Sequence, residues 1–156
     1  MSAFTGPEIA VREEWLDYNG HVTDSAYAVI CAEANEAFLE HLGLSAAYQA
    51  ATGCTTYTVE SHLRYLAEVG RGAVLRSEVL LVGADAKRLR THTTVLDGDT
   101  PVLTGEYLFL HVDQGLGRVT PFPADRAAAI DAVRAEHADL PRPDHLGRGV
   151  PATRSE

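Results

Sequence analysis

The sequence has little that would suit an exported, metal-binding or membrane-embedded protein. It contains only two cysteines in 156 residues, and the wide separation of Cys31 and Cys54 favours two reduced thiols over a disulfide or a C-x-x-C site. The seven histidines do not show H-x-x-x-H spacing, so we expect no metal. There is neither a run of about 20 apolar residues nor a basic-then-apolar amino terminus, which predicts a cytoplasmic protein without a membrane helix.

Positive charge is also scarce. Thirteen Lys and Arg residues stand against 22 Asp and Glu residues, which gives a formal net charge of −9 at pH 7. Nucleic acids and anionic membranes need a broad basic surface, so we expect neither as a partner. The best local basic cluster combines the only lysine, Lys87, with Arg88 and Arg90. It suits a polyanionic ligand, and a solvated hairpin tip is the alternative interpretation.

The overall composition is typical of a globular domain. Apolar residues make up 46% and charged residues 22% of the chain, which excludes the disordered and collagen-like classes. We expect a single domain over residues 1–140. Residues 141–156 are rich in Pro, Arg and Gly, and we expect them to form a flexible tail.

The clearest predicted element is a helix from about Asp24 to Leu42. Cap-type residues such as Thr23 introduce it, and Gly43 ends it. Apolar residues at helical spacing predict one buried stripe, made of Ala26, Val29, Ile30, Ala34, Ala37 and Phe38. Glu33 falls inside this stripe and Asn35 lies opposite it. Glu33 is either a second buried carboxylate or, more commonly for such a position, a rim residue that reaches water.

Four later segments show the two-residue period of β-strands. They span Thr56–Leu66, Val74–Val82, Leu89–Leu96 and Val102–Val112, with a short strand around Ile9–Val11 before the helix and a short helix over Ala124–Ala138 after them. Turn-forming residues connect the four strands, so neighbours should be antiparallel. This order of elements predicts an α+β fold.

Regular alternation along the first of these strands assigns its side chains to two faces. Tyr57, Ser61 and Tyr65 should share one face, and Glu60 and His62 should share the other. Glu60 therefore faces either a binding site or solvent.

The segment just before the long helix carries the most informative side chains. Asp17, Asn19 and His21 place a carboxylate, an amide and an imidazole close to a helix amino terminus. The free N–H groups at such a terminus can stabilise an oxyanion, and a carboxylate opposite could act on a carbonyl carbon. The alternative is that Asp17 and Asn19 only satisfy backbone donors of the loop.

Residues 17–22 have the pattern D-x-x-G-H-V, and a helix with a Tyr in its first turns follows them. This pattern resembles the 4-hydroxybenzoyl-CoA-type hotdog thioesterases. Three blocks of sequence are similar to the betainyl-CoA thioesterases of carnitine breakdown. They are E-W-L-D-Y-N-G-H at 14–21, T-Y-T-V-E-S-H-L-R-Y-L at 56–66 and D-A-K-R-L at 85–89. The resemblance implies an antiparallel sheet wrapped around the long helix. It also implies a homodimer or a dimer of dimers with acyl-CoA sites at the subunit interface and no cofactor, because CoA is part of the substrate.

The resemblance also implies roles for the residues of the pre-helical segment. It places the catalytic carboxylate on Asp17, acting either as a nucleophile or as a general base. Asn19 would donate to the substrate or to Asp17, and His21 would be catalytic or structural. Thr23 stands where the wider family usually has Asn, so its contact with substrate is less expected.

A betaine-like acyl group carries a quaternary ammonium, which needs aromatic rings or a carboxylate as partners because it has no hydrogen to donate. Trp15, Tyr18, Tyr27 and Glu60 are the expected binding residues for it, with Tyr57 and Tyr65 as further available rings. The alternative for most of these rings is a place in the core.

Lys87 and Arg88 are expected to bind the phosphates of CoA. The resulting hypothesis is hydrolysis of a short polar or cationic acyl-CoA, with betainyl-CoA as the best substrate. Two alternatives stay open: a thioesterase for a hydroxyaromatic or medium-chain acyl group, and a hotdog protein that binds acyl-CoA without hydrolysing it.

Overall fold

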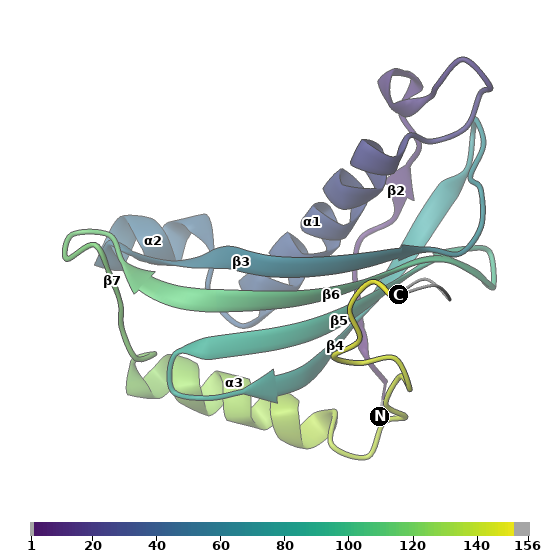
Figure 1. The fold of residues 1–156 in the computed structure, drawn as a ribbon. Helices are drawn as coiled ribbons and strands as arrows, with labels where there is room; N and C mark the ends of the chain where they lie inside the picture. The colour runs from purple at the N-terminus through teal and green to yellow at the C-terminus, as the bar shows by residue number, and fades with distance from the viewer. Residues whose placement is uncertain (1, 152–156) are drawn as a thin grey trace.

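The computed structural model describes residues 2–151. One antiparallel sheet curves around a long helix, α1 (Asp24–His41) (Figure 1). The main strands are β3 (Cys54–Tyr65), β4 (Val74–Ala84), β5 (Arg88–Asp97) and β6 (Thr100–Asp113). The smaller elements are β1 (Phe4–Thr5), β2 (Ile9–Ala10), the 3₁₀ turn η1 (Glu13–Trp15), α2 (Ala46–Thr52), β7 (Arg118–Val119) and α3 (Ala124–Glu136). This arrangement confirms the predicted α+β fold.

The strand order is β1-β4-β5-β6-β3, with β2 also paired to β4 and β7 to β6. All four predicted long strands are present, each one to three residues longer in total than its pattern indicated. Within residues 2–151, β3 is an edge strand, because only β6 pairs with it. None of the described helices combines the length and apolar character that crossing a lipid bilayer demands.

Helix α2 was not predicted, since its seven residues include none that is buried and therefore show no apolar stripe. Local signals form it instead: the Ser45 hydroxyl accepts a hydrogen bond from the Tyr48 N–H, and Gly53 ends the helix at a φ of 72°. The Tyr48 hydroxyl lies 3.0 Å from Nε2 of His111 on β6. This contact ties α2 to the sheet.

The predicted face assignment on β3 is wrong in its first half. The register between β3 and β6 shifts between Thr58 and Glu60, so a β-bulge at this point interrupts the alternation. Tyr57 pairs with Leu110 and Glu60 with Leu108, which places Tyr57 on the same face as Glu60. The bulge arises from strand pairing, and the sequence of β3 carries no clear sign of it.

The buried face of α1 also differs from the predicted stripe. Val29 is 41% exposed, whereas Asn35 is only 2% exposed. The Asn35 amide is satisfied inside the protein: its Nδ2 donates to the Thr93 hydroxyl at 2.9 Å, and its Oδ1 accepts from the Thr91 hydroxyl at 2.8 Å. Polar threonines on the inner face of β5 thus turn this side of the helix toward the sheet. Glu33 pairs with Arg12 at 2.6 Å at a partly exposed position, so it is a rim residue.

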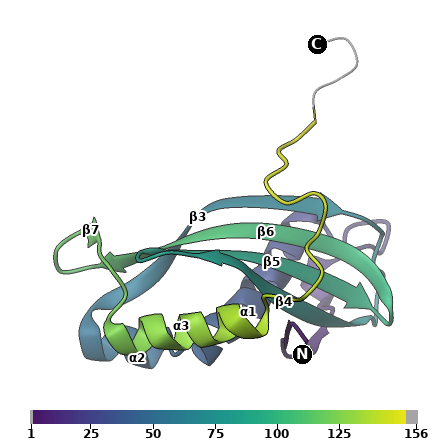
Figure 2. The same cartoon turned by 90° about the horizontal axis from the view of Figure 1, so that it is seen from below.

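After α3 the chain crosses the outer face of the sheet, the face that points away from α1 (Figure 2). Arg142 donates to the Val82 carbonyl at 2.9 Å, and the Gly147 N–H donates to Glu106 Oε2 at 2.9 Å. Nε2 of His145 lies 3.0 Å from Nε2 of His92. Residues 141–151 of the expected tail therefore have specific contacts, and residues 152–156 lie outside the described part. The flexibility of the tail stays a prediction.

Gly105 of β6 lies where side chains of α1, β3 and β6 pack tightly together. A Cβ atom there would lie 2.7 Å from Tyr107 Cε2, 3.0 Å from Leu63 Cδ2 and 3.1 Å from Cys31 Sγ on α1. Contacts of this length cannot be relieved without moving α1 or its neighbours. Glycine is therefore required here by packing.

We expect Gly105→Ala to lower the free energy of unfolding by about 1–3 kcal/mol through overpacking, measured by urea denaturation. Gly83→Ala is the matched control, because a Cβ at Gly83 of β4 would meet only Arg90 Cβ at an ordinary 3.8 Å. Equal stability of the two variants would contradict the close packing at Gly105.

Candidate active site

Three chain segments meet just before α1 and hold the candidate site. Leu16 bridges to Val22, and His21 bridges to Gly70, in the loop between β3 and β4. The Val22 N–H donates to the Val69 carbonyl at 2.9 Å. The turn itself closes through Gly20, whose φ of 78° is a conformation that favours glycine. Residues 21 and 22 thus lie between Leu16 on one side and Gly70 on the other, in a small paired layer.

Asp17 is fixed at the start of this turn. Its Oδ1 accepts hydrogen bonds from the backbone N–H groups of Asn19 at 2.8 Å and His21 at 3.1 Å. Oδ2 accepts no backbone hydrogen bond among residues 2–151. The bond from the His21 N–H, helped by that from Asn19, holds the pKa of Asp17 below the ordinary aspartate value, and the Asn19 side chain lies near enough to the carboxylate to help lower its pKa. The carboxylate is therefore ionised at neutral pH, with one oxygen positioning it and the other open to a ligand.

The start of α1 offers fewer free amides than expected. Thr23 does not cap the helix with its side chain, which corrects the expectation from its type; its hydroxyl lies 3.3 Å from that of Ser25 instead. Asp24 Oδ1 accepts from the Ser25 N–H at 2.8 Å, and the Thr23 carbonyl accepts from Ala26 and Tyr27. Among the described contacts, the Asp24 N–H is the first-turn amide left for an oxyanion.

His21 and Asn19 lie at the surface of the turn. Asn19 is exposed and His21 is partly exposed. The His21 imidazole Nε2 lies 3.7 Å from Glu68 Oε2, so the side chain points toward the loop between β3 and β4. Both residues also position Asp17 through their backbone amides.

The aromatic residues expected to bind the acyl group differ in accessibility. Trp15 is 7% exposed, and the Arg12 guanidinium lies 4.5 Å from the centre of its ring, so its accessible face is already occupied. Tyr18 is 97% exposed. Tyr27 is buried, and its hydroxyl donates to the Ala67 carbonyl at 3.1 Å.

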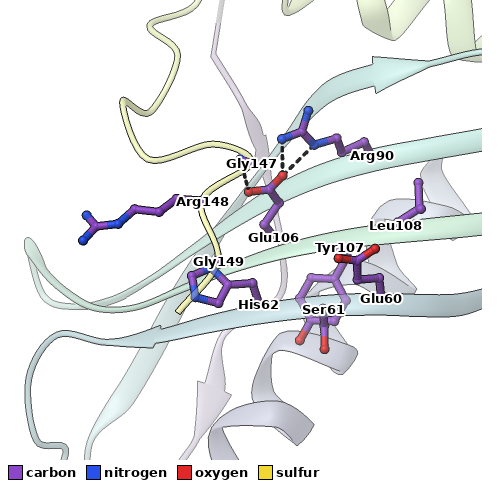
Figure 3. A pocket seen from close by; sticks show the side chains of 10 residues that line it. All are labelled: Glu60, Ser61, His62, Arg90, Glu106, Tyr107, Leu108, Gly147, Arg148 and Gly149. Atoms are coloured by element: carbon purple, nitrogen blue, oxygen red, sulfur yellow. Dashed lines mark hydrogen bonds and ion pairs between the residues drawn. The ribbon is translucent and has the colours of Figure 1, made fainter. Parts of the chain in front are cut away.

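Glu60 and the predicted phosphate-binding residues lie away from this turn within one chain. Glu60 lines a cavity of about 560 Å³ on the outer face, between β3, β6 and residues 147–149 (Figure 3). Lys87 and Arg88 lie at the β4–β5 hairpin, where Arg88 Nε donates to Asp85 Oδ2 at 2.6 Å. The 11 residues of β4, at about 3.3 Å each, separate the hairpin from the Asp17 end by roughly 35 Å.

Two further residues, which contact His21 of the pre-helical turn and Tyr27 of α1, did not enter the predicted site. Glu68 contacts His21, and Tyr65 packs edge-on against Tyr27 with ring centres 5.5 Å apart. Tyr65 was named only as an available ring, and Glu68 was not considered. No spacing rule links residues 65–68 to residue 17, because their proximity depends on the pairing of His21 with Gly70.

Cys31 does not supply a nucleophile for this site. Cys31 is buried beneath the sheet, and burial raises the pKa of its thiol to about 12. Both cysteines are free. Within residues 2–151 no three His, Cys, Asp or Glu side chains gather as metal ligands would. The ionised Asp17 carboxylate stays the candidate reactive group of this site.

Comparison with known sequences places this arrangement in a family. Residues 11–130 match the family described as the thioesterase-like superfamily. The chain is 46% identical over 149 residues to an L-carnitine dehydrogenase/betainyl-CoA thioesterase of Agrobacterium fabrum, covering 94% of this chain and 30% of that protein. It is 36% identical over 151 residues to a betainyl-CoA thioesterase of Pseudomonas aeruginosa, covering 94% of this chain and 95% of that one.

Solved structures show the same fold. A Staphylococcus aureus protein in complex with CoA superposes with a TM-score of 0.90 at 26% identity, covering 97% of this chain and 96% of that one. A Pseudomonas putida protein described as a putative thioesterase gives a TM-score of 0.84 at 26% identity, covering 98% and 99%. With its family match, its 36–46% identical relatives and the hotdog architecture of its sheet and helix, the chain belongs to the thioesterase-like superfamily.

Proposed function

We propose that this protein hydrolyses an acyl-CoA thioester and that betainyl-CoA is its preferred substrate. The observation that carries the proposal is the Asp17 carboxylate, ionised and held by two backbone amides through Oδ1, while Oδ2 accepts no backbone hydrogen bond within residues 2–151. The substrate is inferred from the relatives named as betainyl-CoA thioesterases. The chain spans 30% of the fused Agrobacterium protein, so a dehydrogenase activity is not part of the proposal.

Asp17 can act on the thioester in two ways. As a nucleophile, its Oδ2 bonds to the carbonyl carbon, the C–S bond breaks, and CoA leaves as a thiolate; water then hydrolyses the mixed anhydride. As a general base, Oδ2 takes a proton from a water molecule that attacks the same carbon, and that proton ends on the thiolate. Both routes yield the free acid and CoA, and both need the ionised carboxylate.

We further propose that each site is shared between two subunits that pair through β3. This edge strand exposes Tyr57 by 47% and Val59 by 51%, and an open apolar edge favours pairing with another strand. Pairing of two β3 strands about a two-fold axis is antiparallel. It would bring the Asp17 end of one subunit to the same side as Lys87 and Arg88 of the partner subunit, which lie at the opposite end of their own sheet.

Asp17→Asn should lower kcat by about 100-fold or more, the contribution expected of a positioned acid, base or nucleophile. The amide oxygen of Asn can still accept from the two backbone N–H groups, so the fold should be kept, as checked by thermal unfolding. Asp139→Asn, at an exposed position beyond α3, is the control. Near-normal turnover of Asp17→Asn would remove this residue from the mechanism.

A panel of acyl-CoA substrates, assayed by release of free thiol, should give the highest kcat/KM for betainyl-CoA. Medium-chain and hydroxybenzoyl thioesters should be at least about 10-fold poorer, because their acyl groups lack the positive charge that the site is proposed to bind. A higher kcat/KM for a neutral acyl group would contradict the substrate. Binding of every thioester without thiol release would instead support a non-hydrolysing protein.

Lys87→Ala should raise KM by about 5–10-fold for betainyl-CoA and by less than about twofold for betainyl pantetheine, which lacks the nucleotide phosphates. The effect of Arg88→Ala is harder to interpret, because Arg88 also pairs with Asp85 in the same turn. Equal effects of Lys87→Ala on both substrates would mean that this side chain does not contact the nucleotide.

Mixed dimers test whether the site is shared. Subunits carrying Asp17→Asn are unfolded, mixed equally with subunits carrying Lys87→Ala and Arg88→Ala, and refolded. If sites are shared, half of the dimers hold one intact site, so about a quarter of the wild-type activity should return at low substrate concentration. Activity no higher than the mean of the two parent variants would place each site within one subunit.

A further inference from the structure

Tyr65 and Glu68 form an accessible surface beside the Asp17 turn that none of the proposed steps uses. Tyr65 ends β3 and is 53% exposed. Glu68 lies in the following loop, with 81% of its side chain exposed. An aromatic ring and a carboxylate three residues apart offer the two kinds of partner that suit a quaternary ammonium ion.

Tyr27 of α1 fixes the position of this loop. Its hydroxyl donates to the Ala67 carbonyl at 3.1 Å, and its ring meets Tyr65 at 5.5 Å with an interplanar angle of 75°. Burial raises the pKa of Tyr27, and the negative charge of Glu68 contributes to the rise. The phenol therefore stays neutral and keeps the loop tied to the helix.

Strand-like pairing then sets the distance from Asp17. His21 is hydrogen-bonded to Asp17 on one side and bridged to Gly70 on the other, so Asp17 and the loop of Glu68 are two strand spacings apart, about 10 Å. Glu68 reaches back toward this gap, since its Oε2 lies 3.7 Å from the His21 imidazole. The length of an acyl group with its cationic nitrogen two bonds from the carbonyl carbon is compatible with this spacing of about 10 Å between the two carboxylates.

The negative charge of Glu68 has no permanent positive partner among residues 2–151. No Arg or Lys pairs with it within residues 2–151; Arg71, the nearest basic residue along the chain after it, pairs with Glu13 at 2.5 Å. Its described partner is His21, which is a cation only when protonated. A permanent cation such as a quaternary ammonium can therefore bind next to the Glu68 carboxylate.

We propose that Tyr65 and Glu68 form the subsite for the quaternary ammonium of the acyl group, with Tyr27 as a positioning residue. The inference rests on the proposed thioesterase function and assigns its specificity to these two side chains. The Tyr65 ring contacts the methylated nitrogen through its face, and the Glu68 carboxylate balances its charge. Trp15 is excluded from this role because Arg12 already covers its ring.

The test compares betainyl-CoA with 3,3-dimethylbutanoyl-CoA, which has the same shape but a neutral carbon in place of the nitrogen. Glu68→Gln should lower kcat/KM at least about 10-fold for betainyl-CoA and less than about twofold for the neutral thioester. Tyr65→Leu should lower it about 5-fold with the same selectivity. Glu40→Gln, at an exposed site near the other end of α1, is the control and should leave both values unchanged.

The outcomes separate this inference from the proposed function. If Glu68→Gln lowers kcat/KM equally for both thioesters, Glu68 acts on Asp17 through His21. If it lowers kcat/KM for neither, Glu68 does not contact the substrate. Either result overturns the proposed subsite and leaves the proposed thioesterase activity standing. A wild-type protein that hydrolyses only the neutral thioester would overturn the proposed substrate itself.

Discussion

The site depends on the pairing of the pre-helical turn with itself and with the loop after β3. Two backbone N–H groups hold one oxygen of Asp17, and the same turn is bridged through His21 to the loop after β3. The first interaction lowers the pKa of the carboxyl group and orients it, and the second brings Glu68 beside the His21 imidazole. A structural role and the proposed reactive role can thus coexist in one side chain, because a carboxylate has two oxygens and the backbone of the turn binds only one.

The long strands separate the proposed catalytic carboxylate from the proposed phosphate-binding residues. Asp17 lies at the end where β4 begins, whereas Lys87 and Arg88 lie at the hairpin where β4 ends. An acyl-CoA has its reactive carbonyl and its phosphates far apart, so a substrate of this length suits such a division. Within residues 2–151 only β6 pairs with β3, and this open edge is the physical basis for the proposal that two subunits share each site.

The outer face of the sheet is partly covered by residues after α3, which the strand pattern does not indicate. Residues after α3 cross it and bond to Val82, His92 and Glu106. Together with β3 and β6 they enclose the cavity that Glu60 lines. Glu60 and Asp17 are therefore on different surfaces of one chain, although both belong to blocks of sequence that resemble the same family.

The sequence by itself determined the type and order of the main elements, because apolar periodicity, capping residues and turn residues act locally: α1 begins at Asp24 as predicted, and the four long strands are present. It also singled out Asp17 through a short motif. Tertiary structure alone decided which side of α1 is buried, where Asn35 meets the threonines of β5. It decided the faces of β3, since the bulge at Thr58/Glu60 arises from pairing with β6. It also brought Glu68 next to His21, because contacts between distant segments depend on the pairing of whole strands and loops, which no local pattern encodes.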